Sequence, residues 1–347
     1  MGAKEAFRES NWSSLPIRDL GLVIAGTPLE PVLKDFEGEL ARAGVPLVPH
    51  FYLSTEWGVV PGTTALAIPF YLAHPELSEK HAAEVGHLEG RGREEQLRYL
   101  RHEMGHVVNY AWRLYDEEEW VKLFGPITRP YLEDYRPSPF SRRYVRHLPG
   151  WYAQKHPDED WAETFAVWMT PGRDWRAEYA EHPMALAKLE YCDRTLATLR
   201  ERPPVVTSSE TDEEVAVIPY SVEQFYKGLE PIAGEFPHGL DGALRAIFED
   251  LAAPAPSDSA ASTPADAEKR AAAVLLRALE RPLLDNIYRW TGHFPERTRT
   301  LMRHLAQRAE GLALVYPARE EAAATLAVTT LVTALAMNHV TSGDYLP

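Results

Sequence analysis

The residues best suited to chemistry form one His-Glu-x-x-His sequence, made up of His102, Glu103 and His106. Apolar residues recur around it with helical spacing, which predicts one helix from about residue 94 to residue 114. Residues four apart lie on one face of a helix, about 6 Å apart along its axis. Both imidazoles can therefore reach one zinc ion, and Glu103 can reach a water molecule that this ion activates. These three residues predict a catalytic zinc site.

Two histidines do not complete such a site, which usually takes three protein ligands and leaves one position for water. The metzincin pattern would continue with glycine at position 109 and histidine at position 112, where this chain has Asn109 and Trp112. Cys192 is the only cysteine, which excludes a thiolate zinc site and a disulfide framework. The third ligand must therefore come from a second element.

A second helix is predicted at residues 157–169, where Pro157 suits the first turn and a Pro-Gly pair follows the end. Glu159 and Glu163 stand four apart on one face, beside alanines that would let two helices approach closely. One carboxylate can bind the metal, and the other can accept the free N–H of a ligating histidine. The alternative is that both only favour the positive N-terminal end of the helix.

At these residues the chain resembles the gluzincin metallopeptidases, in particular bacterial zinc-binding metallopeptidases and the lethal-factor-like branch. Those families pair His-Glu-x-Gly-His with a later Glu-x-x-Ala-Glu-x-Phe, and both patterns occur here, the second at residues 159–165. The resemblance covers residues 63–170. It implies a zincin-like fold that binds Zn²⁺, with Glu159 as the third ligand and Glu163 as its supporting neighbour. It also places a tyrosine seven residues before the ligand glutamate, and Tyr152 occupies that position.

The expected function is zinc-dependent hydrolysis of peptide bonds in a protein or peptide substrate. Glu103 would act as the general base, taking a proton from the attacking water and passing it to the leaving amine. Tyr152 is expected to stabilise the oxyanion unless it only packs, and Tyr144 and His147 are further candidates. Two alternatives stay open: a zinc hydrolase of a non-peptide amide or ester, and a non-catalytic zinc-binding regulatory protein. Glu103 argues against the second alternative, because a structural zinc site needs no base.

Composition limits the partners and the location of the protein. The 347 residues carry a formal net charge of −15 and are 45% hydrophobic, which allows a sizeable core and excludes a general nucleic-acid surface. The first residues contain no apolar signal core, so a cytoplasmic protein is expected. Residues 322–337 carry no charge, but a stretch of about 16 residues is short for a membrane span. A buried core helix and no membrane partner are therefore expected.

Secondary-structure patterns predict an α+β zincin-like domain with a small mixed sheet around the active-site helix. A helix is predicted at residues 30–43, and strands are predicted at residues 20–25, 45–54 and 63–73. Pro69 cannot donate to a ladder, which favours an edge position for the last of these strands. An edge strand could pair with an extended peptide substrate.

The predicted domains are the zinc-binding domain at residues 1–202, an acidic connecting region at 203–266 and an all-α module at 267–347. Residues 205–268 hold 13 acidic and 2 basic side chains, so most of the acidic excess lies in the connecting region. Within it, residues 253–265 have the Pro/Ala/Ser composition of a linker. The C-terminal helical module is expected to direct the choice of substrate or protein partner.

Overall fold

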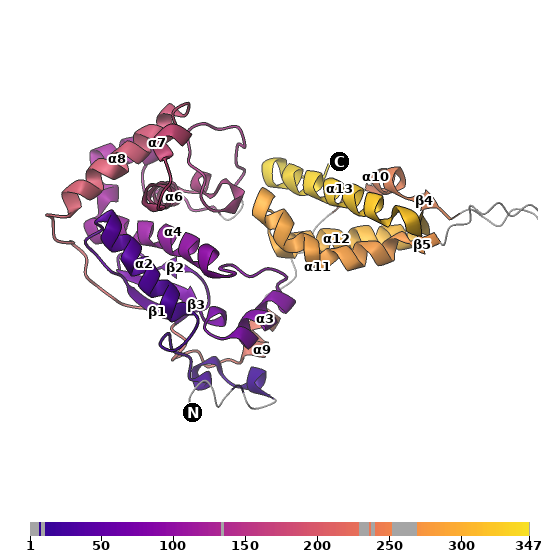
Figure 1. Ribbon diagram of the computed structural model, residues 1–347, viewed down its shortest axis with the longest axis horizontal. Helices are drawn as coiled ribbons and strands as arrows, with labels where there is room; N and C mark the ends of the chain where they lie inside the picture. The colour runs from indigo at the N-terminus through magenta and orange to yellow at the C-terminus, as the bar shows by residue number, and fades with distance from the viewer. Residues whose placement is uncertain are drawn as a thin grey trace, which may run out of the picture. The chain divides into compact units, whose positions relative to one another are not determined.

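The chain divides into two compact units in the computed structural model (Figure 1). The first unit comprises Met1–Glu84 and Leu88–Leu229, and the second comprises Val85–His87 and Glu230–Pro347. The residues that the structure describes are 7, 11–132, 135–228, 236, 240–251 and 269–346. Both units are mostly helical, and each contains a small sheet. The coarse prediction of an α+β region followed by a helical region is therefore confirmed.

The first unit extends to Leu229, so residues 203–229 of the predicted acidic connecting region belong to it. Their backbone is anchored at several points: for example, Val205 N donates to Ala111 O at 2.7 Å, Thr64 N donates to Ser208 O at 2.7 Å, and Val215 N donates to Leu53 O at 3.0 Å. The sequence signals of this stretch are compositional, and composition does not reveal such backbone pairing. The predicted linker at 253–265 lies outside the described residues.

A small mixed sheet forms the base of the first unit. In the described part of the chain its strands are β1 (His50–Ser54), β2 (Gly58–Val59) and β3 (Ala65–Pro69), in the order β1-β3-β2. β1 runs parallel to β3 and β2 runs antiparallel to it. Every residue of β3 is buried, as its central position requires.

The predicted edge position of Pro69 is wrong, because β3 is the central strand. Pro69 is the last residue of β3, and β2 pairs only with Leu66 and Ala67. The missing N–H of the proline therefore lies beyond the short antiparallel ladder and costs no bond there. Because β3 has a strand on each side, the expectation that a substrate peptide pairs with it is no longer supported.

The predicted strand at 20–25 is also wrong. Ile17–Leu20 forms a short 3₁₀ helix, which ends where Gly21 adopts a left-handed conformation with φ 65°. Leu20 is fully buried, but Val23 is 57% exposed, so the apolar run is not a buried strand. Only Leu20 belongs to the 3₁₀ helix, and residues 21–25 form neither helix nor strand, because a short apolar run does not by itself specify a strand.

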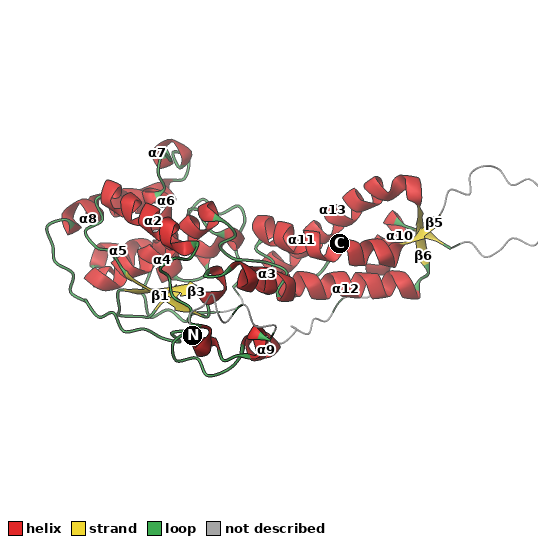
Figure 2. Ribbon diagram, turned by 60° about the horizontal axis from the view of Figure 1, so that its bottom comes forward, coloured by secondary structure: helices red, strands yellow, loops and turns green. Residues whose placement is uncertain are grey.

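Four helices of the first unit position the site, and the first three agree with the predicted ranges to within two residues. They are α2 (Leu29–Ala43), α4 (Arg93–Trp112), α6 (Pro157–Met169) and α8 (Pro183–Leu199). α4 lies between the sheet and α6 (Figures 1 and 2). From Gln96 to Trp112 every residue of α4 except Arg98 is buried, so this helix forms the centre of the unit. Arg101 fixes it to α2 through a buried bidentate pair with Glu39, with both N–O distances at 2.8 Å.

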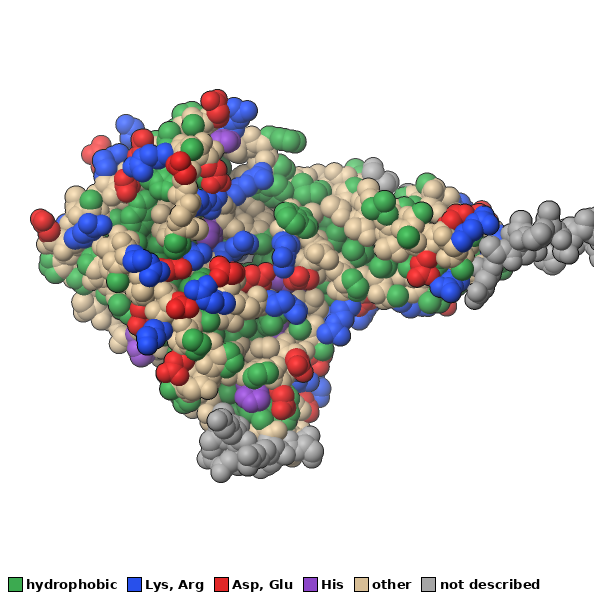
Figure 3. Space-filling model, in the orientation of Figure 1, with side chains coloured by type: hydrophobic (Ala, Val, Ile, Leu, Met, Phe, Trp, Pro, Cys, Tyr) green, Lys and Arg blue, Asp and Glu red, His purple; other side chains and the backbone are tan. Residues whose placement is uncertain are grey.

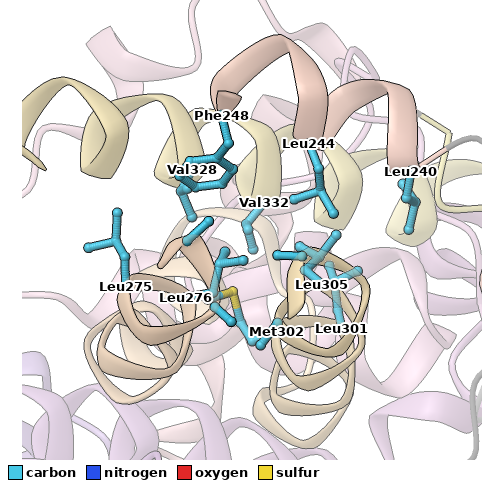
Figure 4. Packing of buried hydrophobic residues seen from close by; sticks show 14 of the residues in the cluster. Leu240, Leu244, Phe248, Leu275, Leu276, Leu301, Met302, Leu305, Val328 and Val332 are labelled. Carbon is cyan, nitrogen blue, oxygen red and sulfur yellow. The ribbon is translucent and has the colours of Figure 1, made fainter. Parts of the chain in front are cut away.

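The second unit contains four described helices and a small sheet. The helices are α10 (Leu240–Ile247), α11 (Ala272–Thr291), α12 (Pro295–Gly311) and α13 (Glu321–Ser342). Leucines, valines, Met302 and Phe248 from these helices and the turn after α10 interlock in one core (Figure 4). Among the described residues, β4 (Glu249–Asp250), β5 (Lys269–Ala271) and β6 (Leu314–Pro317) form an antiparallel sheet in the order β4-β6-β5. The expectation of an all-α module is therefore wrong. β6 follows shortly after α12 and pairs with β4 and β5, which lie far before it in the sequence, so no local pattern predicts this sheet.

One described helix, Ala318–Ser342, has the length and composition of a membrane-crossing segment, with a mean hydropathy of 1.4. Only 28% of its apolar window is buried within the structure. Val328, Val332 and Leu335 lie in the core, whereas Leu326 is exposed, and hydrophobic side chains are scattered among uncharged ones over this unit (Figure 3). The sequence-based preference for a core helix over a membrane span stays a prediction.

Candidate metal centre

Close contact between α4 and α6 creates the candidate site. A Cβ atom added at Gly105 would lie 2.7 Å from the Cα of Ala162, so the crossing requires glycine at this position. The indole Nε1 of Trp161 donates to the carbonyl oxygen of Gly105 at 2.7 Å and fixes the relative position of the helices. The small residues of the two motifs therefore bring their functional side chains together.

A buried ion pair holds α6 on its other side. Lys188 of α8 donates through Nζ to Asp160 Oδ2 at 2.5 Å and to the carbonyl oxygen of Arg143 at 3.0 Å. Burial raises the pKa of Asp160 to about 7 even though Lys188 opposes the shift. The pair holds α6 against α8, because separating the two helices would leave a buried charge uncompensated.

Three ligand atoms converge between the two helices. The Nε2 atoms of His102 and His106 lie 3.3 Å apart, and Glu159 Oε2 lies 3.0 Å from the first and 3.3 Å from the second. Two atoms bound tetrahedrally to zinc at about 2.0–2.1 Å lie about 3.3 Å from each other. All three side chains are buried. The group can therefore hold a metal ion.

Carboxylates behind the histidines select the tautomer that leaves each Nε2 free for a metal. His102 Nδ1 lies 2.9 Å from Glu163 Oε1, and His106 Nδ1 lies 3.0 Å from Asp158 Oδ2. The second contact is ionic, with imperfect hydrogen-bond alignment. Because ionised carboxylates only accept, each Nδ1 carries a hydrogen, and an imidazole that gives up its second proton has an Nε2 lone pair free for a metal.

The resulting cluster of lone pairs fits a cation. Glu159 Oε2 is buried and has no hydrogen-bond donor in the part of the chain that the structure describes. In the metal-free chain, protons must supply the missing positive charge. Burial opposes protonation of His102, but Glu159 and Glu163 outweigh it and raise its pKa to about 9. Metal binding would displace such protons.

Glu163 is held rigidly, which accounts for its role as a support. It is fully buried and accepts hydrogen bonds from the backbone N–H groups of His147 and Leu148 as well as from His102. The ring of His147 donates through Nε2 to the carbonyl oxygen of Arg98 at 2.9 Å. Burial lowers the pKa of His147 to about 4, so the neutral ring has no second N–H for an oxyanion. His147 is therefore removed from the candidate oxyanion donors.

Glu103 is buried beside the two histidines and makes no hydrogen bond or ion pair with any described residue. Burial raises its pKa, and the neighbouring imidazoles only partly oppose this. A carboxylate that is unpaired and more basic than usual is suited to take a proton from water.

Tyr152 lies near the metal centre, in contact with a second tyrosine, Tyr131. It belongs to a short helical segment, Pro149–Gln154, in which Gly150 and Trp151 both have positive φ. Its ring centroid is 5.6 Å from that of His102, and its hydroxyl is 3.2 Å from the hydroxyl of Tyr131. Tyr144 packs instead against Lys188, whose Nζ lies 4.4 Å from its ring centroid.

Two residues of the centre were not predicted from the sequence. Asp158 supports His106 and is itself held by Asn109 Nδ2 at 2.6 Å and by Tyr110 Oη at 2.5 Å. Its position directly before Glu159 is the only sequence signal that could have identified it. Tyr131 donates to Glu159 Oε1 at 2.7 Å from an irregular segment, for which no local pattern exists.

Comparison of the chain with protein-family models, curated proteins and solved structures found no match.

Proposed function

We propose that the chain is a zinc-dependent peptidase of the gluzincin type with a zincin-like catalytic unit. His102, His106 and Glu159 would hold Zn²⁺, and Glu103 would be the general base. The observation that carries this proposal is the convergence of two Nε2 atoms and one carboxylate oxygen within 3.0–3.3 Å, all on buried side chains. Such an arrangement is stabilised only by a positive charge.

A bound zinc ion would polarise a substrate carbonyl and lower the pKa of a water molecule towards about 7. Glu103 accepts a proton from the attacking water at its carboxylate and later passes it to the leaving nitrogen. Asp158 and Glu163 keep the imidazoles in the ligating tautomer. Tyr152 would turn its hydroxyl hydrogen from Tyr131 to the developing oxyanion.

Glu103, which lies beside the two histidines and forms no ion pair with a described residue, favours an enzyme over a regulatory zinc protein, because a structural site needs no base. The motif resemblance favours a peptide or protein substrate over another amide or an ester. We further propose that the second unit selects the substrate or a protein partner and takes no part in the chemistry, and that the protein acts in the cytoplasm.

The test compares the wild-type chain with Glu103→Gln and Glu159→Gln. After dialysis the wild type and Glu103→Gln should each retain about one zinc per chain, whereas Glu159→Gln should lose it. On a fluorogenic peptide library, Glu103→Gln should lower the rate by about 10²–10⁴.

Metal content and turnover answer separate questions in this experiment. Metal-free wild-type protein, prepared with zinc in the medium, would refute the metal centre. Undiminished hydrolysis by zinc-loaded Glu103→Gln would refute the mechanism.

A further inference from the structure

Each oxygen of Glu159 has a different environment. Oε2 faces the two histidine nitrogens, whereas Oε1 accepts a hydrogen bond from Tyr131 Oη at 2.7 Å. Glu159 is 5% exposed, so little solvent is present to satisfy Oε1 if that donor were absent. The phenol therefore decides which oxygen is free for a metal.

The hydroxyl groups form a chain with a single direction. Tyr131 has one hydroxyl hydrogen, and it is directed to Glu159. The contact of 3.2 Å between Tyr131 and Tyr152 must therefore use the hydrogen of Tyr152, with the oxygen of Tyr131 as acceptor. A hydroxyl that accepts one hydrogen bond becomes a better donor in the next, which strengthens its bond to the carboxylate.

A buried cation holds the two rings together. The ammonium group of Lys155 lies 4.4 Å from the ring centroid of Tyr131 and 5.3 Å from that of Tyr152. Such contacts restrain the aromatic rings relative to the backbone. Tyr131 is also adjacent to His156, with ring centroids 5.3 Å apart. Its hydroxyl is therefore held in place from outside the metal centre.

We propose that Tyr131 is a positioning residue that restricts Glu159 to coordination through one oxygen. The inference rests on the proposed metal centre. With Oε1 bound to the phenol, only Oε2 would be available to a bound metal ion, and room for water would remain. Without the phenol, both oxygens could bind the metal and compete with the water.

The test uses Tyr131→Phe, which keeps the ring and removes only the hydroxyl. Tyr131 is 46% exposed, so the change leaves the fold intact. Tyr135→Phe is the matched control, since Tyr135 lies against Tyr152, with ring centroids 6.5 Å apart, but donates to the carbonyl oxygen of Gly150. The readouts are zinc affinity, by competition with a chelator, and the visible spectrum of the cobalt(II)-substituted chain.

Tyr131→Phe should bind zinc about 10–100-fold more weakly than the wild type, as is usual when a group supporting a ligand is removed. Its cobalt(II) absorption should weaken, because five-coordinate cobalt(II) absorbs less than tetrahedral cobalt(II). Tyr135→Phe should match the wild type in both measurements.

Wild-type affinity and spectrum in Tyr131→Phe would overturn the positioning role while leaving the metal centre intact. Equal losses in Tyr131→Phe and Tyr135→Phe would overturn it as well, because they would indicate general loosening. A wild-type chain that binds neither metal would overturn the proposed function itself.

Discussion

Replacing Gly105 with alanine would place a Cβ atom against the backbone of α6. That atom would lie 2.7 Å from Ala162 Cα and 3.1 Å from Ala162 O. An ordinary separation between carbon atoms is about 3.5 Å, so the helices must move apart here by about 0.8 Å. The contact involves backbone atoms, and no side chain can rotate away to relieve it.

The shift acts on the metal ligands because His106 follows Gly105 directly and Glu159 lies one turn before Ala162. If the full shift reaches Glu159 Oε2, its distances to the histidine nitrogens grow from 3.0–3.3 Å to about 4 Å. Tetrahedral zinc requires about 3.3 Å. We therefore expect Gly105→Ala to weaken zinc binding by at least about tenfold, comparable to the loss of a supporting group.

Stability should fall as well, since overpacking a core contact costs about 1–3 kcal/mol. The matched control is Gly38→Ala in α2, where the added Cβ would meet only Arg42 Nη1, at 3.4 Å. That change should stabilise the helix by about 0.5–1 kcal/mol. Urea unfolding in the presence of a chelator measures both effects without the metal. If Gly105→Ala matches Gly38→Ala in stability and the wild type in zinc affinity, the close helix crossing described here is incorrect.

Two further predictions concern the supports of the site and the core of the second unit. Asp158→Asn replaces one of two accepting oxygens by an N–H₂ group, so either Asn109 or the pair Tyr110 and His106 faces another donor. Zinc affinity, measured by chelator competition, should fall about 10–100-fold, and an unchanged affinity would contradict the support of His106. Burial lowers the pKa of His293 to about 3, below its unfolded value near 6.5, so stability should be lost as pH falls through this window. By pH 5 the loss should be about 2 kcal/mol. Hydrogen exchange of the α12 amides should show this loss of stability as pH falls. His293→Gln should lose the dependence of stability on pH. An equal dependence in both proteins would contradict the assignment of the loss to His293. The groups facing His293 are Thr298, Tyr345, His339 and Arg297.

The sequence by itself determined the helices and the spacing of the histidines. The positions of His102 and His106 depend only on helical period, which acts over a single turn. The ends of α2 and α6 follow from Gly44 and Pro157, whose effects on the backbone are equally local. The same period placed Glu159 and Glu163 on one face of α6, and their division into ligand and support came only from a resemblance.

Tertiary structure decided how these local elements combine. The docking of α6 on α4 directs Glu159 Oε2 to the Nε2 atoms and Glu163 to Nδ1. Tyr131 reaches Glu159 from 28 residues away along the chain, through a segment without regular structure. Neither a helical period nor a composition predicts such a contact, because it depends on how distant segments pack. The central position of β3 has the same cause, since the order of strands in a sheet is set by pairing between segments and not by the residues of any one strand.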